Sequence, residues 1–182
     1  NAIQSGVLLH RGEKENFFLA MVQPPQAVPQ AAITPRDYVF VVDISGSMHG
    51  FPLDTAKALM RQLLGNLRPS DRFNVLLFAG SNRMLSPQSV PATPANVNAA
   101  IRTIEQMGGG GSTELLPALR RVYAEPKAPE LARTVVAVTD GYVTVESEAF
   151  ALVRQHLGQA NVFAFGIGSA VNRHLMEGLA RA

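Results

Sequence analysis

The sequence predicts an α/β domain with a doubly wound, mainly parallel central sheet and helices on both faces. Two observations predict it. Apolar runs rich in β-branched residues recur along the chain, and segments with helical spacing of apolar residues separate them. Such runs are typical of strands buried on both faces of a parallel sheet, and crossover helices connect strands of that kind. A chain of 182 residues is long enough for one domain with its own core.

Four apolar runs are expected to form the strands of this sheet, at residues 39–42, 73–78, 134–138 and 162–165. Apolar residues at i, i+3 and i+4 spacing lie between and after them, which predicts helices with one apolar face each. These helices are expected at residues 53–67, 97–104, 115–122 and 150–157 and around 175–179. The sequence then ends where such a fold still needs a closing strand, so we expect the last strand to be missing.

Residues 1–36 form a lead-in, and we place the α/β domain at residues 37–182. The lead-in holds one apolar run at residues 17–22, which predicts a strand, and a Pro-, Gln- and Ala-rich connector at residues 23–35. The first four residues, Asn-Ala-Ile-Gln, lack the features of a secretory signal peptide. We therefore expect the sequence to begin inside a longer protein.

Composition excludes several classes of function. The net charge is only +2 and no segment concentrates Lys and Arg with aromatic residues, which argues against a nucleic-acid partner. The absence of Cys excludes disulfide scaffolds, thiol catalysis and Cys-ligated zinc. No apolar run approaches the roughly 20 residues that a membrane-spanning helix needs.

Polar side chains follow two of the expected strands and the glycine run at residues 108–111. In parallel sheets, ligands bind at the carboxyl ends of the strands, so these loops are expected to meet at one edge. Glycine in the first loop and in the glycine run would allow a tight turn and a close approach of the backbone. The three loops offer five side chains with small oxygen ligands: Asp43, Ser45, Ser47, Thr113 and Asp140.

Five such oxygens suit a hard divalent cation, since these ions prefer oxygen ligands and tend to keep some water. Mg²⁺ is the expected ion, with Mn²⁺ next and Ca²⁺ less favoured. Two carboxylates match the charge of the ion, while the neutral hydroxyls leave it electron-poor. An ion held in this way would accept a further carboxylate from outside, which is a mechanism for recognition and not for turnover.

An apolar strand followed by Asp-x-Ser-x-Ser, a glycine-rich loop with a Thr, and Thr-Asp-Gly after a later strand resembles the metal-ion-dependent adhesion site of von Willebrand factor type A (VWA) domains. The resemblance implies that Ser45, Ser47 and Thr113 contact the ion directly. It also implies that Asp43 and Asp140 act largely through water. The choice of Thr113 over its neighbour Ser112 rests on the resemblance alone. All five positions of the motif are filled.

The sequence around the motif, at residues 17–25, 37–48 and 67–74, resembles the inter-alpha-trypsin inhibitor heavy chain type of VWA domain. Bacterial members of that group often carry a VIT domain ahead of the VWA domain, so residues 1–36 would be the tail of such a neighbour. The resemblance covers roughly residues 17–182. It implies an adhesion module that is monomeric as an isolated domain and that binds a Glu or Asp of a protein or matrix partner. A secreted, periplasmic or cell-surface location would follow.

Each motif also has a plainer interpretation. Asp-x-Ser-x-Ser is also typical of a helix N-cap, the glycine run of a flexible linker, and Asp140-Gly141 of a turn. Their occurrence together, in this order after buried strands, favours the metal site. Gly166-Ile167-Gly168 lacks the third glycine of a dinucleotide-binding fingerprint and favours a tight turn.

Two other classes of function stand as alternatives. The first is a structural VWA scaffold whose metal site is non-functional or only stabilises the fold. The second, less favoured, is a phosphotransferase of the haloacid dehalogenase type, which needs an acidic residue where Ser45 stands. A serine hydrolase is disfavoured because no Gly-x-Ser-x-Gly elbow is present. We therefore expect no enzymatic activity.

Overall fold

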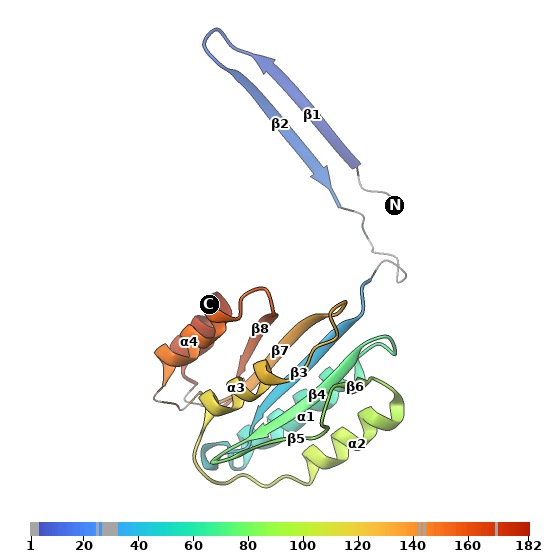
Figure 1. The fold of residues 1–182 in the computed structure, drawn as a ribbon. Coiled ribbons are helices and arrows are strands. Elements are labelled where there is room, and N and C mark those ends of the chain that lie inside the picture. The colour runs from blue at the N-terminus through green and yellow to red at the C-terminus, as the bar shows by residue number, and fades with distance from the viewer. Residues whose placement is uncertain (1–3, 25, 27–32, 142, 144, 170) are drawn as a thin grey trace. The chain divides into compact units, whose positions relative to one another are not determined.

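The computed structural model describes residues 4–24, 26, 33–141, 143, 145–169 and 171–182 (Figure 1). The chain divides into two compact units, Asn1–Thr34 and Pro35–Ala182. The boundary expected at residues 36 and 37 lies two residues beyond this division. Each unit is described by itself below.

The second unit is built on a mainly parallel sheet that, in the described residues, has six strands in the order β5-β4-β3-β7-β8, with β6 also paired to β4. The parallel strands are β3 (Arg36–Asp43), β4 (Arg72–Phe78), β7 (Ala132–Thr139) and β8 (Ala160–Gly166). The short strands β5 (Asn82–Met84) and β6 (Val90–Pro91) run antiparallel to β4. The predicted fold class is therefore confirmed.

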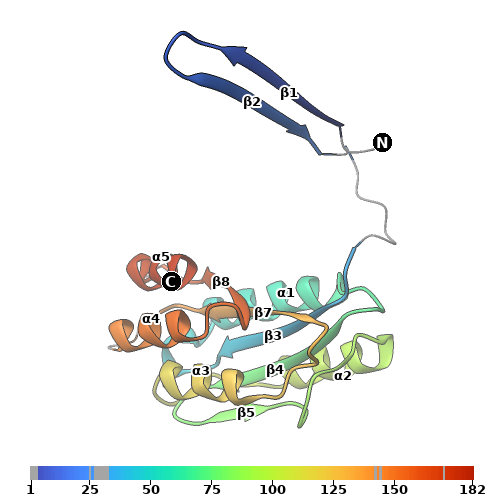
Figure 2. The same ribbon diagram turned by 45° about the horizontal axis from the view of Figure 1, so that its top comes forward.

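Helices cover both faces of this sheet (Figure 2). One face packs on α1 (Phe51–Gly65) and α2 (Pro94–Glu105), and the other on α3 (Leu115–Ala124), α4 (Glu146–Gln155) and α5 (Arg173–Arg181). Successive residues of β3 alternate between the two cores, because side chains point to opposite faces of a strand. Burying each large apolar side chain stabilises the fold by about 1.5–3 kcal/mol. Both cores therefore hold β3 at the centre of the sheet.

The register of the parallel strands places the ends of β3, β4 and β7, and the loops that follow them, side by side. Asp43, the last residue of β3, lies opposite Phe78 at the end of β4. On the other side, Val42 lies opposite Val138, so β7 also ends beside the end of β3. The carboxyl ends of these three strands therefore meet at one edge of the sheet.

All five predicted helices and all four predicted parallel strands are present, with somewhat different ends. The strands β5 and β6 were not predicted. They comprise three and two residues and interrupt the connection between β4 and α2, which shows no apolar alternation long enough to indicate a strand. Their pairing depends on β4, which offers its free edge to them.

The strand β8 forms the other edge of the described sheet. Its two aromatic side chains, Phe163 and Phe165, are 53% and 39% exposed. Val162 and Ala164 point to the opposite face and pack on the core beneath α3, α4 and α5. The expectation that a closing strand is missing stays a prediction. None of the described helices is long and apolar enough to cross a bilayer.

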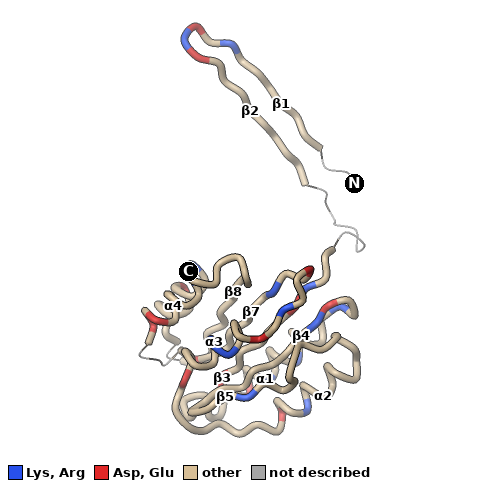
Figure 3. Tube along the Cα trace, in the orientation of Figure 1, with Lys and Arg blue, Asp and Glu red and all other residues tan. Residues whose placement is uncertain are grey.

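The first unit is an antiparallel hairpin of β1 (Gln4–Arg11) and β2 (Asn16–Gln23). Only the second of these strands was predicted. Charged residues gather at the turn of the hairpin, and its strands are otherwise apolar or neutral (Figure 3). Both faces expose large apolar side chains: Val7, Leu8, Leu9, Phe17, Phe18, Leu19, Met21 and Val22. A lone two-stranded hairpin is marginally stable in water, so these faces require burial against further structure. The origin of residues 1–36 in a preceding VIT domain stays a prediction.

The start of β4 is anchored by the buried carboxylate of Asp71. Its Oδ1 accepts hydrogen bonds from the Arg36 amide at 3.0 Å and from Arg68 Nη2 at 2.8 Å. Its Oδ2 accepts bonds from the Arg68 amide at 3.0 Å and from Arg68 Nε at 3.1 Å. Burial by itself would raise the pKa of Asp71, but these hydrogen bonds and the charge of Arg68 outweigh it and hold the pKa below its ordinary value.

Asp71→Asn is expected to lower stability at pH 7 and to make it less sensitive to acid. A carboxyl whose pKa is depressed by folding stabilises the folded state above its unfolded pKa of about 4, and this contribution is lost as pH falls through the folded pKa. The difference in melting temperature between wild type and Asp71→Asn should therefore shrink below about pH 4. A difference that stays constant from pH 7 to pH 2 would contradict this assignment.

Candidate metal centre

Asp43 is the centre of the candidate site. It ends β3 and is 0% exposed. Its Oδ1 accepts a hydrogen bond from the Ser45 amide at 2.8 Å, and its Oδ2 accepts one from the Thr139 hydroxyl. One carboxylate is thus bonded both to its own loop and to the end of β7. These two hydrogen bonds fix the orientation of the carboxyl group.

The first loop presents two serine hydroxyls side by side. Ser45 is fully buried, Ser47 is exposed, and their Oγ atoms lie 3.1 Å apart. Ser45 precedes the 3₁₀ helix η2 (Gly46–Met48), but its side chain makes no capping hydrogen bond. The N-cap interpretation of this motif therefore does not account for its side chain, and the two hydroxyls bond to each other instead.

The glycine run forms the second loop and is bonded directly to the first. The Gly110 amide donates to the Ile44 carbonyl and the Gly46 amide donates to the Gly111 carbonyl, both at 2.9 Å. A Cβ on Gly109 would lie 3.3 Å from the Ser45 carbonyl oxygen, and Gly111 has a φ of 87°. A side chain at either position would be crowded or strained. The run is therefore a close contact between loops and not a flexible linker.

Thr113 follows this contact and is half-buried. Two residues before it, Gly111 is bonded to the first loop, and one residue after it the Glu114 amide donates to the Ala79 carbonyl at 3.0 Å. These bonds place Thr113 at the carboxyl edge of β3 and β4. The neighbouring Ser112 is exposed, and its hydroxyl donates to the Glu114 carboxylate at 3.4 Å.

Asp140 lies in the third loop, directly after β7, and is 9% exposed. Its carbonyl accepts a hydrogen bond from the Asn172 amide at 3.1 Å, which connects the loop to the start of α5. The next residue, Gly141, has a φ of 78°, a conformation that glycine adopts without strain. The structure thus brings the three predicted loops to the same edge of the sheet.

Two carboxylates lie close together at this edge. Burial raises the pKa of Asp43, hydrogen bonds from Ser45 and Thr139 counteract this, and the neighbouring Asp140 raises the pKa further. Buried carboxylates that repel each other are costly unless a positive charge lies nearby. A cation bound at this edge would offset that cost.

One pair of oxygen atoms has the spacing that such an ion needs. Two ligands bound to Mg²⁺ at about 2.1 Å and at a right angle lie about 3.0 Å apart. The Ser45 and Ser47 hydroxyls, at 3.1 Å, match this spacing. No cluster of three His, Cys, Asp or Glu side chains suited to a metal occurs among the described residues, and the candidate site itself contains only two carboxylates. Hydroxyls would have to supply its remaining protein ligands.

Sequence reasoning missed one residue at this edge. Thr139 is fully buried and its hydroxyl contacts both Asp43 and the third loop. It stands in the Thr-Asp-Gly motif, so its position was visible in the sequence, but its hydrogen bonds depend on the pairing of β3 with β7.

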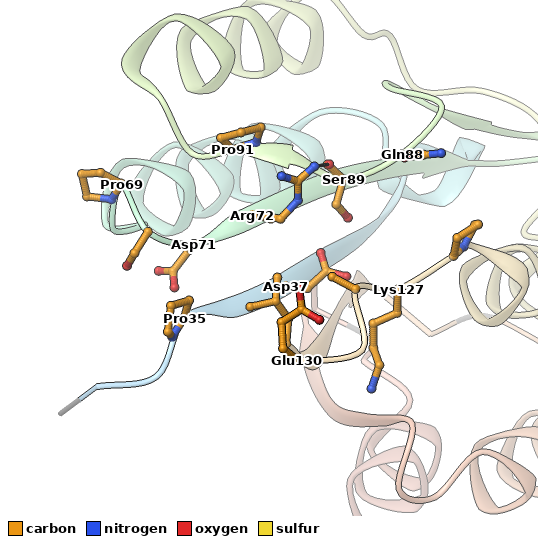
Figure 4. A pocket seen from close by; sticks show the side chains of 14 residues that line it. Pro35, Asp37, Pro69, Asp71, Arg72, Gln88, Ser89, Pro91, Lys127 and Glu130 are labelled. Atoms are coloured by element: carbon orange, nitrogen blue, oxygen red, sulfur yellow. Dashed lines mark hydrogen bonds between the residues drawn. The ribbon is translucent and has the colours of Figure 1, made fainter. Parts of the chain in front are cut away.

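A cavity of about 630 Å³ lies at the opposite edge of the sheet (Figure 4). Asp37, Asp71 and Arg72, from the amino ends of β3 and β4, line it together with Lys127 and Glu130. Its charges are mixed: Arg72 bonds the Ser89 carbonyl, and Asp71 is paired with Arg68. The oxygen atoms that could hold a cation lie at the carboxyl edge and not in this cavity.

Comparison with known proteins agrees with the sequence motif. The family profile of the von Willebrand factor type A domain matches residues 36–182. A von Willebrand factor A domain-containing protein of Dictyostelium discoideum is 34% identical over 162 residues, which cover 86% of this chain and 8% of that protein. Inter-alpha-trypsin inhibitor heavy chain H3 of Bos taurus is 27% identical over 169 residues, covering 86% of this chain and 19% of its own length. The chain thus spans a small part of these relatives.

The fold is also similar to solved structures. The manganese-loaded TRAP protein of Plasmodium vivax superposes with a TM-score of 0.68 at 16% identity, covering 100% of this chain and 67% of that one. A von Willebrand factor type A structure from Catenulispora acidiphila gives a TM-score of 0.70 at 18% identity, covering 81% and 36%. These likenesses support the fold, and the profile match covers most of the chain. This chain belongs to the von Willebrand factor type A domain family.

Proposed function

We propose that this domain is a metal-dependent binding module that recognises a carboxylate of a protein or matrix partner through Mg²⁺ or Mn²⁺. The observation that carries the proposal is that three loops meet at the carboxyl end of β3, where the Asp43 carboxylate is buried and two serine hydroxyls lie 3.1 Å apart. Membership of the VWA family fits a binding module in general terms. The metal and the acidic ligand are our finer proposal.

In this proposal the chain's own residues divide into two roles. Ser45, Ser47 and Thr113 would hold the ion directly, while Asp43 and Asp140 would balance its charge through water. The bound ion would supply a Lewis-acidic position open to an outside carboxylate. Because Ser47 is exposed and Ser45 is fully buried, the open side of the site faces solvent at Ser47.

The surrounding surface would determine which partner is chosen. His49 is exposed next to the first loop, and the Cα of His49 lies 3.3 Å from where a Cβ on Gly109 would be. The segments at residues 79–94 and 142–148, the latter including the first residues of α4, are further candidates for specificity. Tyr142 and Thr144 lie outside the described residues.

The proposal is tested by titrating chelator-treated protein with Mg²⁺ and Mn²⁺ by calorimetry. One saturable site is expected. Immobilised peptides that contain Glu or Asp, with matched Gln or Asn peptides as controls, should then retain the protein only in the presence of metal. Binding of acidic and neutral peptides alike in excess chelator would overturn the recognition mechanism. A metal that raises the melting temperature without affecting any peptide would favour the structural scaffold.

A further inference from the structure

The hydroxyl of Thr139 makes two hydrogen bonds at the candidate metal centre. It donates to Asp43 Oδ2 and accepts from the Gly141 amide at 2.9 Å. One hydroxyl carries one proton and two lone pairs, so both bonds can form at once. Thr139 is 0% exposed, so water does not compete for either bond. One side chain thus connects the first and third loops of the site.

We infer that Thr139 is a positioning residue that holds Asp43 and the loop of Asp140 in the geometry that binds the ion. This inference rests on the proposed function. It assigns a role to a residue outside the five ligands of the motif. Thr139 would not contact the ion, and it would act through the carboxylate and the backbone that it bonds.

The hydrogen bonds of Asp43 show why the hydroxyl matters. Oδ1 is oriented by the Ser45 amide and Oδ2 by Thr139, so both oxygens are held and the carboxyl group cannot rotate without breaking a bond. Each oxygen keeps a second lone pair for a further partner. Without the hydroxyl, only the bond from Ser45 would remain to orient Asp43.

The bond to Gly141 fixes the third loop in the same way. Asp140 stands between Thr139 and Gly141, and its own carbonyl accepts the Asn172 amide at 3.1 Å. A Cβ on Gly141 would lie 3.0 Å from Asn172 Cβ, so the loop passes close to the start of α5. The peptide group that joins Asp140 to Gly141 is therefore held at its carbonyl by Asn172 and at its N–H by Thr139.

The test compares Thr139→Val with Thr139→Ser. Valine keeps the shape of threonine and removes the hydroxyl, whereas serine keeps the hydroxyl. The same strand offers a matched control: Thr134 is 3% exposed and its Oγ1 has no hydrogen-bond partner among the described residues, so Thr134→Val makes the same chemical change away from the site. Removal of a group that orients metal ligands typically costs about 10–100-fold in metal affinity.

Calorimetry should show Mn²⁺ affinity at least about tenfold weaker in Thr139→Val, and within about threefold of wild type in Thr139→Ser and Thr134→Val. Hydrogen exchange measured in chelator gives a readout independent of the metal: the Gly141 amide should exchange faster in Thr139→Val alone. Unchanged exchange at Gly141, or unchanged affinity in Thr139→Val while wild type binds, overturns this inference and leaves the proposed function standing. A wild type that binds no metal overturns the proposed function, and this inference with it.

Discussion

Asp43→Asn is expected to abolish metal binding while the folded domain persists. The substitution removes the charge that the ion requires and replaces one acceptor oxygen with an amide group that donates. Asp43 Oδ1 and Oδ2 each accept a hydrogen bond, so the asparagine can satisfy only one of them with its oxygen. We expect Mn²⁺ affinity to fall by more than about 100-fold, since loss of charge and loss of geometry act together. Calorimetry with the chelator-treated variant measures this.

The same variant should not lose stability in the absence of metal. Asp43 is fully buried near Asp140, and two neighbouring carboxylates repel each other. A neutral side chain relieves that repulsion, which offsets the imperfect hydrogen bond. Residues at functional sites commonly trade stability for function in this way. We expect the melting temperature in chelator to be unchanged or raised.

A matched control is Asp54→Asn, which removes an exposed carboxylate from the first turn of α1. It should bind Mn²⁺ as the wild type does. If Asp43→Asn binds Mn²⁺ with wild-type affinity, Asp43 is not part of the site. If it unfolds in chelator, the loss of affinity says nothing about ligands, and Asp43→Ser becomes the variant to compare.

The parts of the site that sequence could predict are those that lie close together along the chain. One loop after a buried strand holds Asp43, Ser45 and Ser47. Ligands of parallel sheets bind at the carboxyl ends of the strands, and this rule alone places the three residues at the carboxyl edge. The position of Asp140 follows from the same rule, whereas the glycine run lies between two helices, α2 and α3. Whether side chains at this edge meet, however, depends on loop conformation, which for Thr113 is fixed by backbone bonds from Gly111 and Glu114. Nothing in the local sequence specifies those bonds.

Pairing between distant strands accounts for most of what sequence reasoning did not predict. Thr139 reaches Asp43 across 96 positions, and Arg133 reaches Asp37 across the same interval, because β3 and β7 are neighbours in the sheet. Hydrophobic periodicity predicts that these strands exist but not which strands are adjacent. The same limit on prediction applies to the hairpin, where β1 was not predicted. Residues 4–6 have no strand pattern of their own, and β1 is paired along its length with β2.

Arg133→Met, at the amino edge of the sheet, is expected to destabilise the second unit strongly. The guanidinium is 3% exposed and forms a salt bridge with Asp37 Oδ2, at 2.7 Å from Nη2 and 2.9 Å from Nε. It also donates to three backbone carbonyls at the end of α3 and just beyond, those of Val122, Glu125 and Pro126. Methionine fills similar volume but removes the donors to Asp37 and to the carbonyls of Glu125 and Pro126, while the Val122 carbonyl keeps its bond from the Glu125 amide.

Removing one partner of a buried ion pair typically costs about 3–5 kcal/mol, because the remaining charge stays buried without compensation. Here the remaining charge is Asp37, which is 2% exposed. The carbonyls that follow α3 add to the cost, since helix ends buried without partners are unfavourable. Urea denaturation should show a loss of about 3–5 kcal/mol in the free energy of unfolding. An exposed ion pair provides the contrast. The side chains of Arg61 and Glu105 are 55% and 42% exposed. Arg61→Met breaks this pair and should lower the free energy of unfolding by less than about 1 kcal/mol.

The double variant Arg133→Met/Asp37→Leu separates the two sources of this loss. If the buried charge of Asp37 dominates, its replacement by an apolar residue recovers most of the stability, as happens when whole buried ion pairs are exchanged for apolar side chains. If the carbonyls after α3 dominate, the double variant stays as unstable as Arg133→Met. A single variant that loses less than about 1 kcal/mol would mean that Arg133 behaves like a surface arginine, and that the amino edge of β3 and β7 is held by backbone pairing alone.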